Sequence, residues 1–347
     1  MRNFIIALVL LLAIVFLITR FTEVQGIIDI LRSGAWYYIG LAVGVVLLWL
    51  LNVSASYQVI YRIVGIQESK RRLALLAATA QFVNTVMPAV AGASAAAVFL
   101  NDGRKRGHSV GRVMAAWALF LVFDYTGLLA VVTLGLVVLH RRGISQWGEL
   151  VAFGIVLLIA CAILLQLILA MKAPHILGRV LATGARWFNR AGRLIRRKEI
   201  FDIDRAYSFA NELSDGMAKV RGQPRRLLLP LLLAMTNKAL LIVVLLLIFL
   251  AFNTAFTAGT LIAGFGIAYL FVIVSPTPSG LGIVEAAMTL ILRSLRVPLE
   301  AATVITLAFR GLTFWLPWLI GMIAFRGITI LDRKPVERNF KENLIDN

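Results

Sequence analysis

Residues 259–292 read GTLIAGFGIAYLFVIVSPTPSGLGIVEAAMTLIL, an apolar stretch that prolines, serines and glycines interrupt near its middle. An uninterrupted apolar run of about 20 residues crosses the hydrocarbon core of a bilayer as one helix. Pro276 and Pro278 prevent a helix from continuing, whereas Gly280 and Gly282 permit backbone angles that other residues avoid. The stretch therefore predicts two short helices that are joined by a break inside the membrane.

A second broken stretch lies in the first half of the chain. Residues 73–100 are apolar but contain Pro88 and Gly92, and they are too few for two full crossings. Lipid cannot hydrogen bond with the backbone groups that a break exposes, so breaks persist only where protein buries them or where they line a polar cavity. Two proline kinks in ordinary spanning helices are the alternative interpretation of the two stretches.

Further apolar runs surround these two stretches and predict full spans. The runs are residues 4–19, 35–60, 113–139, 150–171, 227–251 and 301–325. The first run resembles a signal peptide, but it is longer than the usual apolar core and no small-residue cleavage site follows, so we expect a retained span. Of the 347 residues 60% are hydrophobic and only 15% are charged, which favours an integral membrane protein over soluble domains.

The distribution of basic residues decides between topologies. Lys and Arg gather on the cytoplasmic side of membrane proteins. If both broken stretches are re-entrant, 27 basic residues fall on one side and 6 on the other. If residues 73–100 instead crossed once, the segment 172–226 with its 13 basic residues would lie outside. We therefore predict an all-α membrane protein with about six full transmembrane helices plus two re-entrant or broken helical hairpins, an arrangement compatible with an inverted repeat. More crossings result if residues 259–292 form two short spans.

We expect one integral membrane domain over residues 1–326 and a polar cytoplasmic tail over residues 327–347. Within the domain, the segment 172–226 combines apolar residues at helical spacing with arginines, which is typical of a basic amphipathic helix on the inner leaflet. A helix packed against the ends of the spans is the alternative. The net charge of +18 does not indicate nucleic-acid binding, because no base-stacking or groove-reading motif accompanies the basic loops.

Few side chains are suited to catalysis or metal binding. Cys161 is the single cysteine, and the three histidines lie far apart in the sequence. No phosphate-binding loop, nucleophile elbow or zinc-ligand spacing is present. We therefore expect no metal, no cofactor and no enzymatic activity of this chain.

Ionisable residues inside the predicted spans are the main candidates for a ligand site, because charges deep in a bilayer are costly. They are Asp124, Lys238, Glu285 and Arg310. Two acids and two bases can pair completely, so structural ion pairs are the alternative. Asn84 in the first break, with Gly280 and Gly282 in the second, completes the predicted substrate-binding set. A helix that restarts near Gly280 would direct its N-terminal N–H groups at an anion.

Two motifs in the second half of the chain resemble a known family. Residues 276–285 read PTPSGLGIVE, and residues 310–321 read RGLTFWLPWLIG. These motifs are similar to the signatures of the lysylphosphatidylglycerol synthase transmembrane region, a flippase-like domain family. The segment from Asn84 to Gly92 resembles the first motif of this family in outline, and Asp124 falls where the family often has an aspartate. Val90 and Ala93 depart from it, because they occupy positions where arginine and glutamate are common.

The resemblance implies a bacterial inner-membrane protein with both termini in the cytoplasm. Its expected function is to bind or translocate a lipid or lipid-linked headgroup, and its expected partners are anionic membrane lipids. The chain lacks the aminoacyl-transferase domain that full-length synthases carry, so lysyl transfer is not expected. The alternative function is that of an accessory or regulatory subunit, whose partner would be a lipid-modifying enzyme or a glycosyltransferase.

Overall fold

The computed structural model describes residues 32, 34–86, 93–144, 147–194, 203–218, 224–275 and 277–328. Over these residues the regular structure is entirely helical. Five segments are long and apolar enough to cross a membrane: Trp36–Ile63, Val110–Arg141, Trp147–Lys172, Arg225–Ala251 and Leu299–Ile328. They confirm five of the six predicted spans, and the remaining one, residues 4–19, lies outside the described residues.

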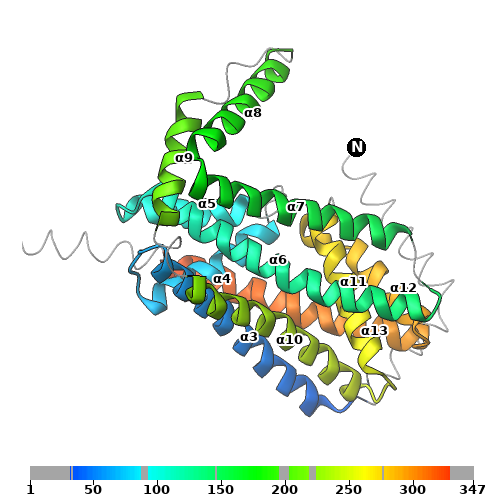
Figure 1. Ribbon diagram of the computed structural model, residues 1–347. Coiled ribbons are helices and arrows are strands. Elements are labelled where there is room, and N and C mark those ends of the chain that lie inside the picture. The colour runs from blue at the N-terminus through cyan, green and yellow to red at the C-terminus, as the bar shows by residue number, and fades with distance from the viewer. Residues whose placement is uncertain are drawn as a thin grey trace, which may run out of the picture.

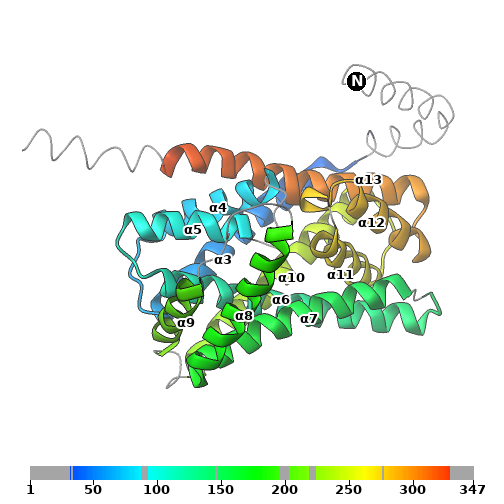
Figure 2. The same cartoon turned by 90° about the horizontal axis from the view of Figure 1, so that it is seen from above.

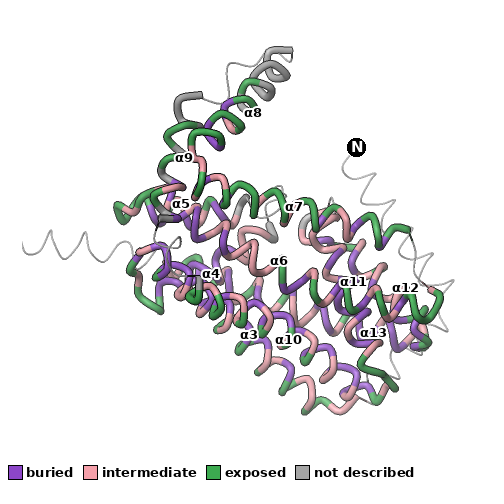
Figure 3. The backbone as a smooth tube through the Cα atoms, viewed as in Figure 1, coloured by how far each residue is buried: buried purple, intermediate pink, exposed green. Residues whose placement is uncertain are grey.

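The spans form a bundle in which the helix axes are roughly aligned, with neighbouring helices parallel or antiparallel (Figures 1 and 2). Helix α3 (Trp36–Ile63) packs along α10 (Leu228–Ala251), and α10 also contacts α6 (Val110–Arg141) and α13 (Leu299–Arg310). Helix α7 (Trp147–Lys172) is apolar on all sides and mostly exposed (Figure 3). This exposure suits a helix at the edge of the bundle whose outer face contacts acyl chains.

Glycines bring α6 close to α11 (Ala258–Val274). A Cβ atom on Gly135 would lie 3.1 Å from the Cα of Ala263, and a Cβ atom on Gly266 would lie 3.3 Å from the Cα of Val132. Each helix therefore presents a glycine to the backbone of the other. Such close approach increases van der Waals contact, which is a main attraction between helices in lipid because both lipid and side chains are apolar.

Both predicted helix breaks are present. The first lies between α4 (Lys70–Val86) and α5 (Ala93–Lys105), and the second lies between α11 and α12 (Ile283–Ser294). The two helices of each pair pack against each other, so each stretch folds back on itself and is not a kinked rod. The pairs occupy opposite ends of the bundle (Figures 1 and 2).

The tips of the two helix pairs meet inside the bundle. Helix α4 contacts the 3₁₀ turn Pro278–Gly280, which belongs to the second break. Pro278 is part of this turn, whereas Pro88, Gly92 and Pro276 lie outside the described residues. Two helix ends from opposite ends of the molecule therefore converge on one region, and the cavity described below lies there.

Ion pairs connect helix ends and loops at the end of the bundle that contains α4 and α5. Arg72 forms a buried ion pair with Asp102, with 3.0 Å between Nε and Oδ1. Glu68 accepts hydrogen bonds from Arg106 and from His108 Nε2, the latter at 2.9 Å. Burial raises the pKa of the Glu68 carboxyl, but the hydrogen bonds from His108 and Arg106 outweigh this effect and lower the pKa below its usual value.

The basic segment 172–226 contains two further helices. Helix α8 (Pro174–Leu194) packs against α9 (Ile203–Ala218), and α9 packs against α6 and α7. Figure 1 shows α8 projecting from the bundle, at an angle to α7. The amphipathic helix predicted in this segment is therefore present, and α9 links it to the spans.

Gly321 offers a test of the contact between α4 and the last span. A Cβ atom at this position would overlap the carbonyl oxygen of Ala78 and lie 2.7 Å from the Cβ of Phe82. Backbone cannot move aside as a flexible side chain can, so we expect Gly321→Ala to lower the free energy of unfolding by about 1–3 kcal/mol. The matched control is Gly311→Ala, since no atom lies within 4 Å of its added methyl group. Thermal unfolding in detergent measures both, and equal midpoints would contradict the packing described here.

Candidate functional site

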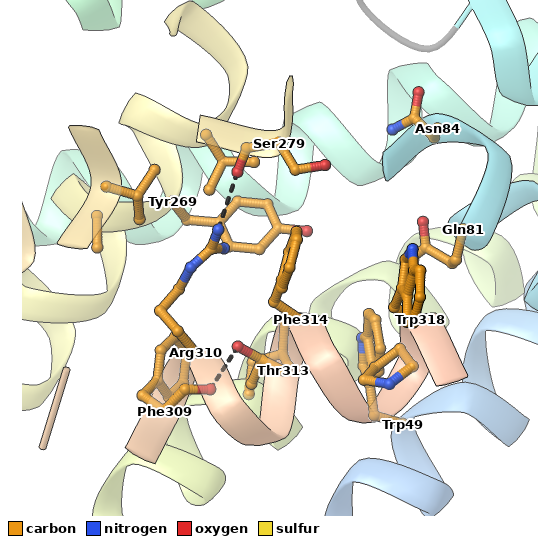
Figure 4. A pocket seen from close by; sticks show the side chains of 15 residues that line it. Trp49, Gln81, Asn84, Tyr269, Ser279, Phe309, Arg310, Thr313, Phe314 and Trp318 are labelled. Carbon is orange, nitrogen blue, oxygen red and sulfur yellow. Dashed lines mark hydrogen bonds between the residues drawn. The ribbon is translucent and has the colours of Figure 1, made fainter. Parts of the chain in front are cut away.

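A cavity of about 120 Å³ lies where the tips of the two helix pairs meet. Its lining comes from α3, α4, α10, α11, the second break, α12 and the last span. Figure 4 shows Arg310, Ser279 and Tyr269 on one side of the cavity, facing Gln81, Asn84 and Trp318 on the other. The cavity therefore combines a cation and amide groups with aromatic rings, a lining that suits a ligand with both charged and apolar parts.

Arg310 is held in a fixed position at the cavity wall. Its Nε donates a hydrogen bond to Glu285 Oε1 at 2.7 Å, and its Nη2 donates to the carbonyl oxygen of Ser279 at 3.0 Å. The guanidinium also lies over the ring of Phe314, 4.6 Å from its centroid. Arg310 also lines the cavity, so its guanidinium lies within reach of a ligand there.

The second break has a backbone conformation that places these partners. Ser279, Gly280 and Gly282 all have positive φ angles, of 50°, 74° and 82°. A side chain at Gly280 would overlap Val284 Cγ2 and lie 3.3 Å from the Cα of Val272, so this position also requires glycine for space. The turn directs the carbonyl of Ser279 towards Arg310 (Figure 4).

Glu285 has two functions in this turn. Its Oε2 accepts a hydrogen bond from the N–H of Gly282 at 2.7 Å, while its Oε1 holds Arg310. The first contact caps the N-terminus of α12, as a glutamate at the third helical position commonly does. The Gly282 N–H group is thus occupied by a side chain of the protein, and the cation that faces the cavity is Arg310.

A π-helical turn, Gly311–Trp315, follows Arg310 directly. Such turns are rare, and they frequently occur at functional sites. Thr313 lies within it and donates a hydrogen bond from Oγ1 to the carbonyl of Phe309 at 2.7 Å. Phe309, Arg310, Thr313 and Phe314 all line the cavity, so this wall is built where the last span departs from regular α-helical geometry.

The other two intramembrane charges pair with each other. Lys238 Nζ lies 2.7 Å from Asp124 Oδ1 and 4.6 Å from the centroid of the Tyr269 ring. Lys238 is 1% exposed and does not line the cavity. Tyr269 contacts Lys238 and also lines the cavity, so it is the wall between the buried pair and the cavity. The neighbouring Asn237 accepts a hydrogen bond from Asn52 of α3 at 2.7 Å.

A family model for the lysylphosphatidylglycerol synthase TM region matches residues 4–321, which is most of the chain. The chain belongs to this family. The match includes both helix breaks, both ion pairs inside the predicted spans and every residue that lines the cavity. Among curated proteins no similar sequence was found.

The lysylphosphatidylglycerol synthase transmembrane fold brings together only part of the predicted site. Arg310 and Asn84 line the cavity, and Glu285 holds Arg310. Gly280 and Gly282 shape the turn without lining the cavity, whereas Asp124 and Lys238 form a separate pair behind Tyr269.

The sequence analysis did not predict several of the residues that line the cavity of this family member. They are Trp49, Gln81, Tyr269, Ser279, Phe314 and Trp318. An aromatic residue in an apolar run can face lipid, the protein core or a cavity, and the sequence of the run does not distinguish these positions. Ser279 acts through its carbonyl group, which no side-chain pattern reveals. A polar residue such as Gln81 within an apolar stretch is the one signal that could have been used.

Proposed function

We propose that the protein binds an anionic lipid headgroup beside Arg310 and translocates that lipid across the bacterial cytoplasmic membrane without altering it covalently. The observation that carries this proposal is the position of Arg310. Its guanidinium lies on a cavity wall within the bundle of spans, and Glu285 and the Ser279 carbonyl hold it in place. Burying a charge at this depth is costly unless the charge is paired or serves a ligand.

A phosphate-containing headgroup fits this cavity chemically. The planar guanidinium presents several N–H donors in a fixed geometry that matches phosphate and carboxylate oxygens. The amide side chains of Gln81 and Asn84 lie on the opposite side of the cavity, where they suit polar groups beyond the phosphate (Figure 4). Trp49 and Trp318 extend the lining with apolar surface that suits the start of an acyl chain.

The arrangement of the two broken helix pairs supports movement in addition to binding. We interpret α4–α5 and α11–α12 as hairpins that enter the membrane from opposite faces. Transporters with inverted repeats place their substrate between such discontinuous helices, and rearrangement around that site opens it to each side in turn. The end that carries α4, α5, α8 and α9 holds most basic residues, and it is therefore the cytoplasmic end in this proposal.

Reconstitution tests the proposal directly. Purified protein is incorporated into liposomes that contain a trace of fluorescent phosphatidylglycerol, and a membrane-impermeant reductant destroys the label on the outer leaflet. We expect the protected inner-leaflet fraction to become accessible in liposomes with protein and to stay protected in liposomes without it. Fluorescent phosphatidylcholine is the matched control, because its headgroup is zwitterionic and we expect its movement to be slower.

The same preparation distinguishes the alternative function. If the protein moves neither lipid while a lipid-modifying enzyme or a glycosyltransferase co-purifies with it, the accessory function replaces transport. Equal movement of both lipids would show that Arg310 does not select an anionic headgroup. The Gly154→Ala variant serves as a neutral reference, because Gly154 lies on α7 away from the cavity and its added methyl group meets no atom within 4 Å.

A further inference from the structure

The outer face of α8 carries two parallel stripes of side chains that no other part of the described structure covers. His175, Arg179 and Arg186 are exposed and lie four and seven residues apart, so they share one face of the helix. Ile176 and Val180 form the adjacent stripe, and they are 39% and 54% exposed. A cationic stripe beside an apolar stripe is the pattern of helices that lie in the membrane interface.

The opposite face of α8 is occupied by α9. Leu177 is buried, and a Cβ atom on Gly178 would lie 2.5 Å from Cδ1 of Tyr207 in α9. This close packing sets the rotation of α8 about its own axis. The exposed stripes therefore keep a constant direction, and α8 cannot turn to bury them against the bundle without losing its contact with α9.

Helix α8 starts directly after the end of a span. Helix α7 is a span that ends at Lys172, and α8 begins at Pro174 after a single intervening residue. Hydrogen bonds from the N–H groups of Ile176 and Leu177 to the carbonyl of Ala173 fix the bend. From there α8 runs away from the bundle and not along α7 (Figures 1 and 2).

We propose that this outer face of α8 binds the anionic surface of the cytoplasmic leaflet. Arg179 and Arg186 contact lipid phosphates, while Ile176 and Val180 insert between headgroups and the first acyl-chain carbons. The charges favour lipid over a protein partner, because the apolar stripe is narrow and lies next to cations. This inference concerns lipid next to α8 and does not depend on transport through the Arg310 cavity.

Photocrosslinking of neighbouring lipids tests the proposal. The full chain is prepared with p-benzoylphenylalanine in place of Val180, placed in nanodiscs of phosphatidylcholine with a minority of phosphatidylglycerol, and irradiated. Mass spectrometry then gives the ratio of the two lipids in the adducts. We expect phosphatidylglycerol to be enriched over its bulk ratio by about fivefold for each arginine that contacts a phosphate. The variant Arg179→Gln/Arg186→Gln should return the ratio to the bulk value.

A probe in place of Trp147 is the matched control, because this exposed residue begins α7 at the other end of the bundle. We expect its adducts to have the bulk lipid ratio, and the formation of these adducts shows that the labelled protein lies in the bilayer. A bulk ratio at position 180 in the otherwise unchanged protein overturns the proposal. A protein adduct in place of lipid adducts at position 180 in native membranes also overturns it, because the face would then be a docking site for a partner.

Discussion

Replacing Arg310 with glutamine is expected to slow the translocation of fluorescent phosphatidylglycerol by about 10- to 100-fold, because hydrogen bonds to a charged group each contribute about 1.5–3 kcal/mol. The neutral amide keeps some hydrogen-bonding capacity but loses the charge that faces the cavity. Arg310→Lys keeps the positive charge but loses the planar guanidinium with its several N–H donors, so we expect an intermediate rate of translocation. The reductant-accessibility assay described above measures all three proteins.

A structural effect of Arg310→Gln must be separated from a loss of the ligand. The single substitution leaves the Glu285 carboxylate without its partner, so it also destabilises the fold. The double variant Glu285→Gln/Arg310→Gln removes both charges and should recover most of the thermal stability. We expect it to remain inactive in translocation. If the double variant moves lipid as fast as the unchanged protein, the pair is structural and the proposed binding site is wrong.

Replacing Lys238 with methionine is expected to lower the free energy of unfolding by about 3–5 kcal/mol, because it leaves a largely buried carboxylate unpaired. Lys238 Nζ contacts Asp124 at 2.7 Å and packs against the ring of Tyr269 at 4.6 Å. Methionine has a similar length and fills the same space, so the lost charge dominates over lost packing. Denaturation of the purified protein in mixed micelles measures the change.

The matching double variant is Asp124→Asn/Lys238→Met. It removes both charges, so we expect it to recover most of the lost stability, as replacement of a whole buried ion pair often does. Coupling between the two substitutions is the decisive quantity. Purely additive effects would show that Lys238 and Asp124 act independently, which contradicts the ion pair. A double variant that is stable but slower in translocation would indicate that Tyr269 transmits the state of the pair to the cavity.

The sequence by itself determined the class of the protein and the location of its spans. Apolar runs of the required length are sufficient to locate the spans. Lipid offers no hydrogen-bond partners to the backbone, so such runs cross the membrane as helices, in which the backbone groups pair with each other. The prolines of the second break and the basic segment 172–226 together predicted that residues 259–292 and 73–100 would fold back on themselves. The family resemblance rested on residues 276–285 and 310–321, which the structure places side by side in the contact between Glu285 and Arg310.

Only the tertiary structure decided how the four intramembrane charges pair and which of them reach the cavity. Nothing in the sequence shows that Asp124 belongs with Lys238, since 114 residues separate them and any acid could have met either base. Pairing follows from helix packing, and packing in lipid depends on the shapes of many small contacts, such as Gly135 against Ala263. The Ser279 carbonyl and the ring of Tyr269 are part of the site for the same reason. The backbone direction of the turn and the rotation of α11 place them there, and the amino-acid sequence does not reveal either.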